Sequence, residues 1–562
     1  MKRNYFSFLL LACPLMMKAQ NIKLITLDPG HFHAALIQKS MYPQVDPTVH
    51  VYAEESRDLK LHLEKIDGYN KRTAEPTAWK ENVYTGKDFF IKMIAEKKGN
   101  VVVLAGNNRL KTNYILESVR NGFHVFADKP MAVDTKGFEQ LKLAFNEAKK
   151  KGVQLYDIMN ERFEISPRLR NTSLALIAVG IIALVAGLFN LKLSHDHVDQ
   201  TRFWIVLLHN SVFFAMVTVA SIFILAATSL AQGGWIVAYR RVPEAIGANM
   251  WLFGGIAVVV LLSIVYFFQI DGHNPIFHWV HPHGDAILEG KKAFLNPTMF
   301  TAFTVITVAL WSYFGFKFRA ISLAQDLAPK GKTKLYFYNM KVAALFLVVF
   351  CLTMMSTTPW LWVMSIDAHW YSTLFSWYNF ASSFVSGMAM IMLWVVYLKN
   401  QGNLKIVNKE HIHDLGKFLF AFSVFWTYLW FSQFMLIWYA NIPEETTYFK
   451  VRMQGPYSII FYANFIINFI MPILILMARP SKRNYFTVTF MAMIIVFGHW
   501  LDFFQMEMPG PLGAHWHLGW YEIGIFAGFI GLFIFAVSKS LAKHSLVTSN
   551  NPLLKETIIH QS

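Results

Sequence analysis

The hydrophobic pattern divides the chain into two parts that differ in the length of their apolar runs. From residue 172 onward, ten apolar segments are long enough to cross a bilayer, whereas residues 21–165 contain only short runs. A helix needs about 20 apolar residues to cross a hydrocarbon core of about 30 Å, and a barrel strand needs only about ten. The second part is therefore predicted to be ten transmembrane helices, at 172–191, 204–231, 249–270, 297–317, 341–363, 371–398, 415–439, 456–478, 485–505 and 517–537.

The first part shows the alternation of short strands and helices that is typical of an α/β domain. Strands are expected at Ile22–Leu27, His50–Ala53, Val101–Leu104 and His124–Phe126, with a helix at Lys111–Asn121. Strands that alternate with helices form a parallel sheet covered by those helices. The fold class expected for the whole chain is thus an all-α polytopic membrane protein preceded by a partial α/β, Rossmann-like domain.

Two short segments flank these domains. Residues 1–20 place Lys2 and Arg3 ahead of the apolar run Phe6–Ala12, which is typical of an export signal. The predicted organisation is a signal-like leader at 1–20, a nucleotide-binding domain at 21–165, a membrane domain at 172–540 and a cytoplasmic tail at 541–562.

Composition agrees with a membrane protein and limits its redox chemistry. Apolar residues make up 55% of the chain and charged residues 15%, whereas soluble domains carry about 25% charged residues. Cys13 and Cys351 are the two cysteines, too few for a four-cysteine iron–sulfur or zinc site, and there is no Cys-x-x-Cys-His haem motif. We therefore expect no haem or iron–sulfur cluster in this chain; if it handles electrons, partner subunits carry those centres.

Lysine and arginine are distributed unequally between the two alternate sets of loops in the membrane domain. One set holds 18 of them and the other holds six. Loops rich in lysine and arginine lie on the cytoplasmic side of a membrane. Both ends of the ten-helix domain are therefore predicted to be cytoplasmic.

This orientation conflicts with the leader. An export signal would place residues 21–165 outside the cytoplasm, whereas the membrane domain requires residue 170 inside. No further apolar crossing is visible between residues 21 and 171. Either the leader does not export, or two halves that were not selected together are joined near Ile165–Arg168.

Ionisable and polar residues inside the spans are costly, so they mark candidate functional sites. Towards the outer face, the sequence places a set suited to quinol chemistry, because oxidising a quinol releases two protons and needs bases with a pKa of about 6 to 7. The quinol and proton candidates are His209, Asp367, His369, Gln433, His499 and Asp502. The alternative for each is an interfacial belt or a helix cap.

A second polar set lies towards the predicted cytoplasmic face. Its members are Glu244, His411, His413 and Asp414. They are candidates for the mouth of a proton path, or for anchors that reach towards the interface. Glu244 stands beside two arginines and is expected to form a salt bridge.

Histidine pairs and clusters are candidate metal sites in this sequence. His209 and His499 lie at similar depth and form the one pair that could ligate a b-type haem. The loop His278–Asp285 contains three histidines, but their spacing fits no standard structural zinc site and is better explained by contact with a partner. No metal site is predicted.

The first domain resembles the Gfo/Idh/MocA oxidoreductases in its strand–glycine turn and in the segment that ends at Lys129. The resemblance implies a dinucleotide site with Gly30 in the phosphate turn, Glu54 near the ribose and Lys129 near the nicotinamide. Asp28 and His33 stand where the family has its outer glycines. The second α/β domain of the family should begin near Arg162, where a hydrophobic helix follows instead, so this domain reads as truncated, with NAD(P) bound only if it is functional.

The membrane domain resembles the NrfD/polysulfide-reductase family, and within it the ActF-type subunit of alternative complex III. The residues that carry the resemblance are Ser365–Thr373, His411–Lys417, Phe431–Glu445 and Gly498–Asp502. It implies two paired four-helix bundles, spans two to five and six to nine, in a bacterial inner membrane. It also implies a quinone such as menaquinone as cofactor.

The partners implied are membrane lipid, iron–sulfur and c-type cytochrome subunits, a second NrfD-like subunit and a terminal oxidase, with no nucleic acid. The leading function is a membrane subunit of a respiratory quinol:electron-acceptor oxidoreductase that binds quinol, conducts protons or supports assembly. The alternatives are a membrane-tethered NAD(P)-dependent dehydrogenase and a purely structural anchor.

Overall fold

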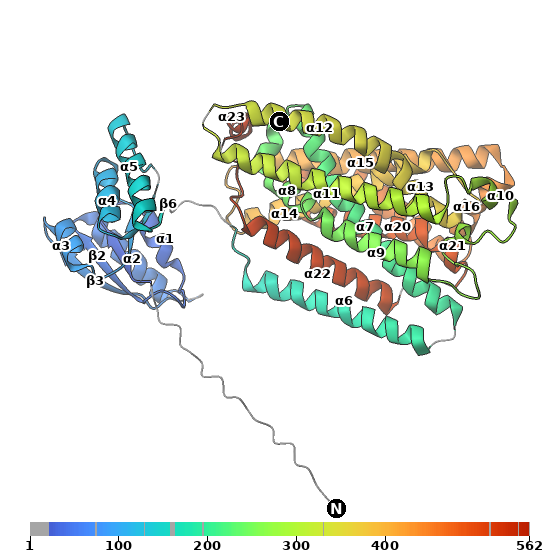
Figure 1. The fold of residues 1–562 in the computed structure, drawn as a ribbon, viewed down its shortest axis with the longest axis horizontal. Coiled ribbons are helices and arrows are strands. Elements are labelled where there is room, and N and C mark those ends of the chain that lie inside the picture. Colours follow the sequence, from blue (N-terminus) through green and yellow to red (C-terminus); the bar gives the residue numbers. More distant parts are fainter. Residues whose placement is uncertain are drawn as a thin grey trace, which may run out of the picture. The chain divides into compact units, whose positions relative to one another are not determined.

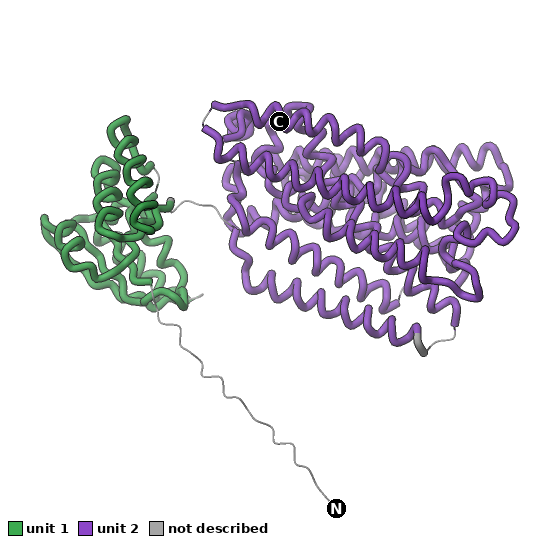
Figure 2. Tube along the Cα trace, in the orientation of Figure 1, with its two compact units in different colours: residues 1–160 green, residues 161–562 purple. Residues whose placement is uncertain are grey.

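The computed structural model describes residues 22–73, 76–128, 130–157, 163–193, 196–329, 331–515, 519–548 and 550–560. The chain forms two compact units, residues 1–160 and 161–562, which are coloured separately in Figure 2.

Unit 1 is a six-stranded parallel sheet with helices between its strands. In chain order its elements are β1 (Leu24–Leu27), α1 (His33–Leu36), η1 (Ile37–Lys39), β2 (Thr48–Ala53), α2 (Arg57–Lys71), β3 (Lys80–Thr85), α3 (Phe89–Glu96), β4 (Val101–Leu104), α4 (Asn108–Arg120), β5 (His124–Ala127), α5 (Thr135–Lys151) and β6 (Leu155–Asp157). The strand order is β3-β2-β1-β4-β5-β6, which is that of a dinucleotide-binding fold. The predicted Rossmann-like domain is confirmed.

Local sequence explains where these elements begin and lie. The apolar run of β1 is buried along its whole length, as expected for a central parallel strand. Ser56 accepts a hydrogen bond from Leu59 N and caps α2, and Asp134 caps α5 in the same way through Gly137 N. The topological switch lies between β1 and β4, so ligands of such a sheet bind at the carboxyl ends of these two strands.

Unit 2 is helical (Figure 1). Its principal helices are α6 (Pro167–Leu193), α7 (His197–Leu230), α8 (Arg241–Gly247), α9 (Met250–Phe267), α11 (Pro297–Leu327), α12 (Lys334–Leu352), α13 (Thr358–Trp362), α14 (Leu374–Asn400), α15 (Lys409–Ala440), α16 (Pro443–Met453), α17 (Ser458–Phe465), α18 (Met471–Leu476), α20 (Tyr485–Glu507) and α22 (Trp520–Ala542). Further elements are η2 (Gly234–Ala238), η3 (His278–Val280), α10 (Ala286–Lys291), η5 (Met364–Asp367), η6 (Gly455–Tyr457), α19 (Arg479–Arg483), α21 (Pro509–Leu512) and α23 (Leu554–Ile558).

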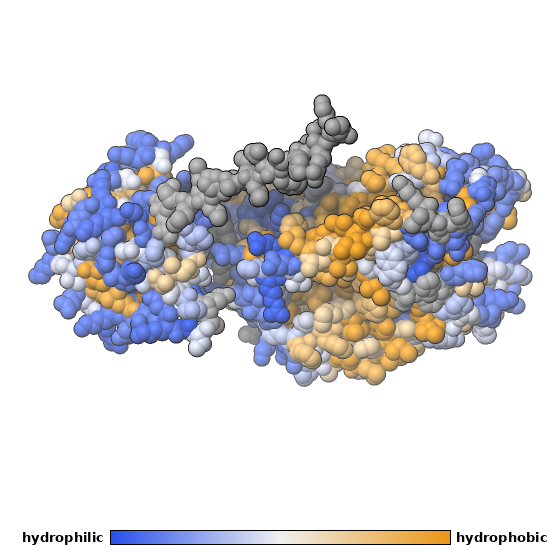
Figure 3. Space-filling model, turned by 90° about the horizontal axis from the view of Figure 1, so that it is seen from below, coloured by the Kyte–Doolittle hydropathy of each residue, from blue (hydrophilic) through white to orange (hydrophobic). Residues whose placement is uncertain are grey.

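Ten stretches among the described residues are long and apolar enough to cross a membrane. They begin and end within a few residues of the predicted spans, except that several extend by one to three turns. The expectation of a multi-pass membrane protein is thereby supported. On the face shown in Figure 3, hydrophobic residues of unit 2 form a belt between polar ends.

Two spans contain a turn of π-helix. Thr353–Thr357 (η4) joins α12 to α13, and Ile466–Ile470 (η7) joins α17 to α18. A π-turn inserts a residue into the helical ladder and often marks a functional site. The side chain of Asn468 in η7 lies against α20. A Cβ on Gly498 of that helix would lie 2.1 Å from Asn468 Oδ1.

The spans are unequally buried. α7 and α14 are enclosed along most of their length, whereas α6 is largely exposed and lies beside α22 (Figure 1). Glycines permit this last contact, since a Cβ on Gly528 would lie 2.6 Å from the Cα of Gly180. Close packing of small residues is a usual way to join helices in lipid.

Candidate functional site

A buried carboxylate, Asp502 on α20, is the centre of the polar cluster in the membrane unit. Ser382 Oγ donates to Asp502 Oδ2 at 2.8 Å, and Trp426 Nε1 donates to the same oxygen at 2.8 Å. The Tyr378 hydroxyl donates to the other oxygen, Oδ1. His499 Nδ1 lies 3.0 Å from Ser382 Oγ. We name these five residues the Asp502 cluster.

Helix periodicity brings the cluster together from three helices. Tyr378 and Ser382 are one turn apart on α14, and His499 and Asp502 are three residues apart on α20, so each pair shares a helix face. Trp426 reaches in from α15. His499 and Asp502 are fully buried. Two sequence-predicted residues therefore meet, together with three that were not predicted.

A second buried pair lies nearby on α20. His209 Nδ1 on α7 is 2.8 Å from Glu507 Oε2, and both side chains are completely buried. One proton bridges these two atoms. His209 Nε2 and Glu507 Oε1 have no hydrogen-bond partner among the described residues. Next to this pair, Trp500 Nε1 donates to Asn210 Oδ1 at 3.0 Å.

Several other buried polar atoms in this region are without a partner in the described part of the chain. They are His499 Nε2, both amide atoms of Asn468, Gln433 Nε2, Asn379 Oδ1 and Asn464 Oδ1. Each buried polar group without a hydrogen bond costs about 1–3 kcal/mol. A concentration of such groups therefore indicates a place where water or a polar ligand supplies the missing bonds. Gln433 therefore has an amide nitrogen that can donate to water or a ligand, but no hydrogen bond joins it to the Asp502 cluster among the described residues.

Asp367 forms an ion pair outside that cluster. Arg452 on α16 donates to Asp367 Oδ2 at 2.8 Å, and its other nitrogens donate to backbone carbonyls of Tyr448 and Gln505. The guanidinium lies 3.3 Å from the centre of the Tyr448 ring, which stacks on Trp370. Burial raises the pKa of Tyr448 well above its ordinary value. This arrangement is a structural clasp on the end of α20.

His369 lies apart from the buried histidines. Its side chain is 53% exposed, and Nε2 lies 2.6 Å from Asp285 Oδ2. The hydrogen bond from His369 lowers the pKa of Asp285. The six predicted quinol and proton candidates therefore divide between the Asp502 cluster, the His209–Glu507 pair, the Arg452 clasp and this exposed pair, with Gln433 separate.

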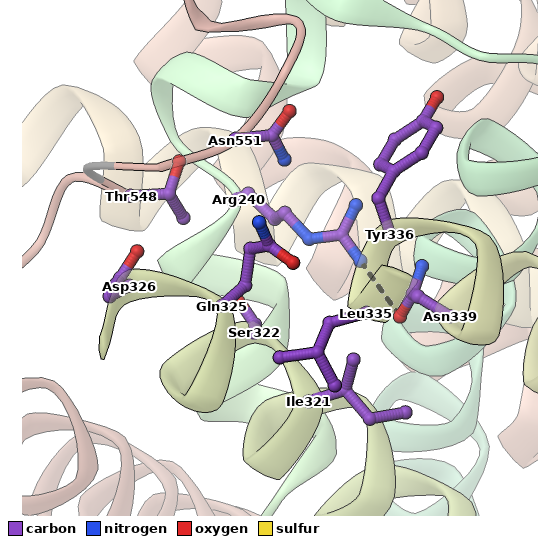
Figure 4. Close-up of a pocket in the computed structure, with 10 residues that line it drawn as sticks. All are labelled: Arg240, Ile321, Ser322, Gln325, Asp326, Leu335, Tyr336, Asn339, Thr548 and Asn551. Atoms are coloured by element: carbon purple, nitrogen blue, oxygen red, sulfur yellow. Dashed lines mark hydrogen bonds between the residues drawn. The ribbon is translucent and has the colours of Figure 1, made fainter. Parts of the chain in front are cut away.

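At the opposite end of the bundle, Glu244 lies buried between two arginines, as expected. Arg240 Nε donates to Glu244 Oε1 at 2.9 Å, and Arg241 Nη1 donates to Oε2 at 2.8 Å. Figure 4 shows Arg240 facing Asn339, and the two are 3.4 Å apart. Residues Thr548 and Asn551 line the same pocket. With both carboxylate oxygens bonded, Glu244 fits a structural ion pair.

The segment after α22 covers the other predicted cytoplasmic residues. His411 Nε2 lies 3.0 Å from Thr557 Oγ1, and His560 Nε2 lies 2.6 Å from Asp414 Oδ2. His411 also closes a capping box with Asn408 at the start of α15. His413 Nδ1 lies 3.8 Å from Asp414 Oδ1. The predicted tail is thus bound to His411 and Asp414.

In unit 1 the candidate site is a cleft of about 790 Å³ at the carboxyl ends of the central strands. Gly30 and Glu54, which the resemblance assigns to the phosphate turn and the ribose, both line it. Lys129 lies outside the described residues. The cleft also contains Asp28, Asp58 and Asp128, so its lining is strongly acidic.

The loops around this cleft are tightly packed. Gly30 N and His31 N both donate to Ala105 O, at 3.0 and 2.8 Å. A Cβ on Gly106 would lie 2.0 Å from Asp28 O, so only glycine fits there. Asp28 itself adopts φ +47°. Burial and then the carboxylates of Glu54 and Asp58 raise the pKa of Asp28.

Comparison with known proteins bears on unit 1. Residues 48–157 match the Gfo/Idh/MocA family model, described as an oxidoreductase family with an NAD-binding Rossmann fold. The chain is 49% identical to a solved structure titled a putative oxidoreductase from Parabacteroides merdae ATCC 43184, over 30% of this chain and 36% of that chain, with a TM-score of 0.26. The chain thus spans about a third of that structure. No curated protein matches it. An oxidoreductase-type Rossmann segment is therefore joined to ten membrane-length helices.

Proposed function

We propose that unit 2 is a membrane subunit of a quinol-oxidising respiratory complex of the alternative complex III type, and that it accepts protons at the Asp502 cluster. The observation that carries this proposal is the pairing of His499 with Asp502 in a fully buried site. Ionisable groups buried inside a membrane bundle are rare and are by default candidates for function.

The chemistry needs a base that can receive a proton and pass it on. In this proposal His499 Nε2, which has no partner among the described residues, accepts a proton from the quinol hydroxyl. Ser382 links His499 to the Asp502 carboxylate through bonds of 3.0 and 2.8 Å, which gives the proton a route to the carboxylate. Quinol oxidation releases two protons and two electrons, and iron–sulfur and c-type cytochrome subunits take the electrons.

The His209–Glu507 pair offers a second proton-holding site on the same helix. Its members lie 2.8 Å apart and both are excluded from solvent. Glu507 and Asp502 are five residues apart on α20, so water between them would complete a path along this helix. We propose that the unpartnered amide oxygen of Asn379 on α14, whose nitrogen donates to Met506 Sδ, holds such water.

The test is quinol oxidation by the assembled complex. Asp502→Asn keeps the shape of the side chain but removes its proton affinity, and His499→Gln removes the base; each should lower turnover by about 10²-fold or more. Ser386→Ala is the matched control, since among the described residues this buried α14 hydroxyl bonds to the Ser382 carbonyl within its own helix.

Turnover at the wild-type level in both variants would refute a direct role for the cluster. If the complex assembles and both variants are fully active, unit 2 serves as a structural anchor. Poor assembly of a variant is identified by the loss of the partner subunits during purification. Turnover is then compared with the wild type per mole of assembled complex.

A second candidate function, NAD(P) binding by unit 1, is favoured by the strand order and by the cleft at the β1–β4 switch point. Glu54 at the end of β2 is placed to accept hydrogen bonds from a ribose. Titration of the full chain with NADH should then show binding that Glu54→Ala weakens about tenfold. The absence of any saturable signal with NADH or NADPH would exclude this function.

A further inference from the structure

Two histidines and one carboxylate meet at the floor of the unit 1 cleft. His31 precedes α1 and His33 begins it, while Asp128 follows β5. His33 Nδ1 lies 3.3 Å and His31 Nδ1 lies 3.7 Å from Asp128 Oδ2. The ligand-type atoms of all three residues lie within 4.8 Å of one another.

These spacings agree with the coordination shell of a small divalent ion. With metal–ligand bonds of about 2.0–2.2 Å, neighbouring ligand atoms are about 3.0 Å apart in an octahedral shell and about 3.4 Å in a tetrahedral one. For a tetrahedral shell, the two histidine–aspartate distances differ from this spacing by about 0.3 Å or less. The histidine–histidine separation, which is at most 4.8 Å, would shorten by up to about 1.4 Å. Side-chain rotation alone can supply such shifts.

Asp128 is held in place by neighbours that leave one oxygen available. Lys111, itself buried, donates to Asp128 Oδ1, and Asn108 Oδ1 accepts from the same ammonium at 2.6 Å. Oδ2 is the atom that faces the histidines. Fixing a ligand through its second oxygen is the usual outer-shell arrangement around a metal.

The opposite side of the group opens into the cleft. His31 and Asp128 both line this cavity of about 790 Å³, and His31 is 47% exposed at its side chain. Three protein ligands with an open side are typical of catalytic or exchangeable metal sites, whereas structural sites are closed by a fourth ligand.

The charge of the cleft favours a cation. Asp28, Glu54 and Asp58 line it beside Asp128, and no lysine or arginine is among the residues that line it in the described part of the chain. The carboxylates around the three proposed ligands therefore attract a cation.

We propose that His31, His33 and Asp128 form a binding site for a first-row divalent transition-metal ion, with the remaining coordination positions open to the cleft. Two histidines and one carboxylate on one face of the ion suit Fe²⁺, Co²⁺ or Zn²⁺ better than Mg²⁺ or Ca²⁺, which prefer oxygen ligands. The site is independent of whether unit 1 also binds a dinucleotide, because the metal alone is the ligand.

The competing explanation is a purely hydrogen-bonded loop. In that case His33 and His31 orient Asp128 at the end of β5, and the group has no affinity for metals. The two explanations predict different results when a metal is added. If the loop is only hydrogen-bonded, substitutions at these three residues leave metal binding unchanged.

The experiment is titration of the full chain in detergent, purified without a histidine tag, with Co²⁺ alone. We expect saturable binding with visible d–d absorption, and an affinity at least tenfold lower in His31→Ala and in Asp128→Asn. His31→Ala is the safer variant for folding because its side chain is half exposed. His50→Ala is the matched control, a half-buried histidine of the same unit whose ring lies 3.3 Å from the Tyr84 hydroxyl.

Co²⁺ binding of equal affinity and equal spectrum in wild type, His31→Ala and Asp128→Asn would overturn the proposal, as would the absence of binding to the wild type. An equal loss in His50→Ala would also contradict it, because the effect would then not belong to these three residues. Mg²⁺ in place of Co²⁺ should show no binding that depends on His31.

Discussion

Replacing Asp502 by leucine and by asparagine separates two roles of this carboxylate. Its two oxygens accept from Tyr378, Ser382 and Trp426. Asparagine can keep the bonds from Ser382 and Trp426 through its oxygen, and its amide can donate to the Tyr378 oxygen, which reverses the direction of that third bond. Leucine has the same branched shape and number of side-chain heavy atoms, and it keeps none of them.

The magnitude follows from the groups that leucine leaves unpaired. Ser382 retains its 3.0 Å contact with His499, whereas Trp426 N–H and the Tyr378 hydroxyl lose the partner that asparagine still offers them. Each unpaired buried group costs about 1–3 kcal/mol, so the two together cost about 2–6 kcal/mol. Both substitutions remove the same buried carboxyl group and its desolvation cost, and the difference between the variants therefore isolates these two groups.

The assay is the free energy of unfolding in mixed micelles titrated with SDS, with Ser386→Ala as the control that leaves all Asp502 contacts intact. We expect Asp502→Leu to be less stable than Asp502→Asn by about 2–6 kcal/mol, and Ser386→Ala to stay within about 1 kcal/mol of the wild type. Equal stability of the leucine and asparagine variants would refute the reasoning, because Trp426 and Tyr378 would then find partners elsewhere.

Three further predictions concern other parts of the chain. Burial raises the pKa of Glu81 to about 7 and lowers that of His62 to about 4. As pH rises from 4 to 7, unit 1 should therefore lose stability through Glu81 and gain it through His62. In Glu81→Gln, the free energy of unfolding should rise more steeply with pH than in the wild type, as measured by pulse proteolysis in urea. Gly528→Ala should destabilise the micellar protein by about 1–3 kcal/mol, while Gly255→Ala, whose Cβ meets nothing within 4 Å, should not. A cysteine at exposed Gln401, in a variant without native cysteines, should react with an impermeant maleimide only in inverted vesicles; reaction only in right-side-out vesicles would reverse the orientation.

Much of the fold could be predicted because the decisive signals are local. A run of about 20 apolar residues identifies a span regardless of its neighbours. The central strands β1 and β4 are apolar and buried, so they too could be located. Lys80–Thr85 could not, because this edge strand is mostly exposed and its sequence has no hydrophobic alternation.

The partners within the sites could not be predicted because they are distant in sequence. Tyr378 and Asp502 are 124 residues apart, and His209 and Glu507 are 298 apart. Spans that are apolar on every side carry no periodic signal that shows which face points inward. Glu507 could have been found by the rule that a carboxylate at the end of a span needs a partner, but only the fold identifies His209 as that partner.

The contact between α6 and α22 joins the first membrane helix to the last. Gly180 and Gly528 are separated by 348 positions in a chain that is made from one end to the other. At about 5–20 residues per second, synthesis takes about 20–70 s to pass from one glycine to the other. During that time α6, which is otherwise mostly exposed, presents its glycine face to lipid. The helices around Asp502 can pack first, and α6 packs against α22 only when the ribosome has almost finished.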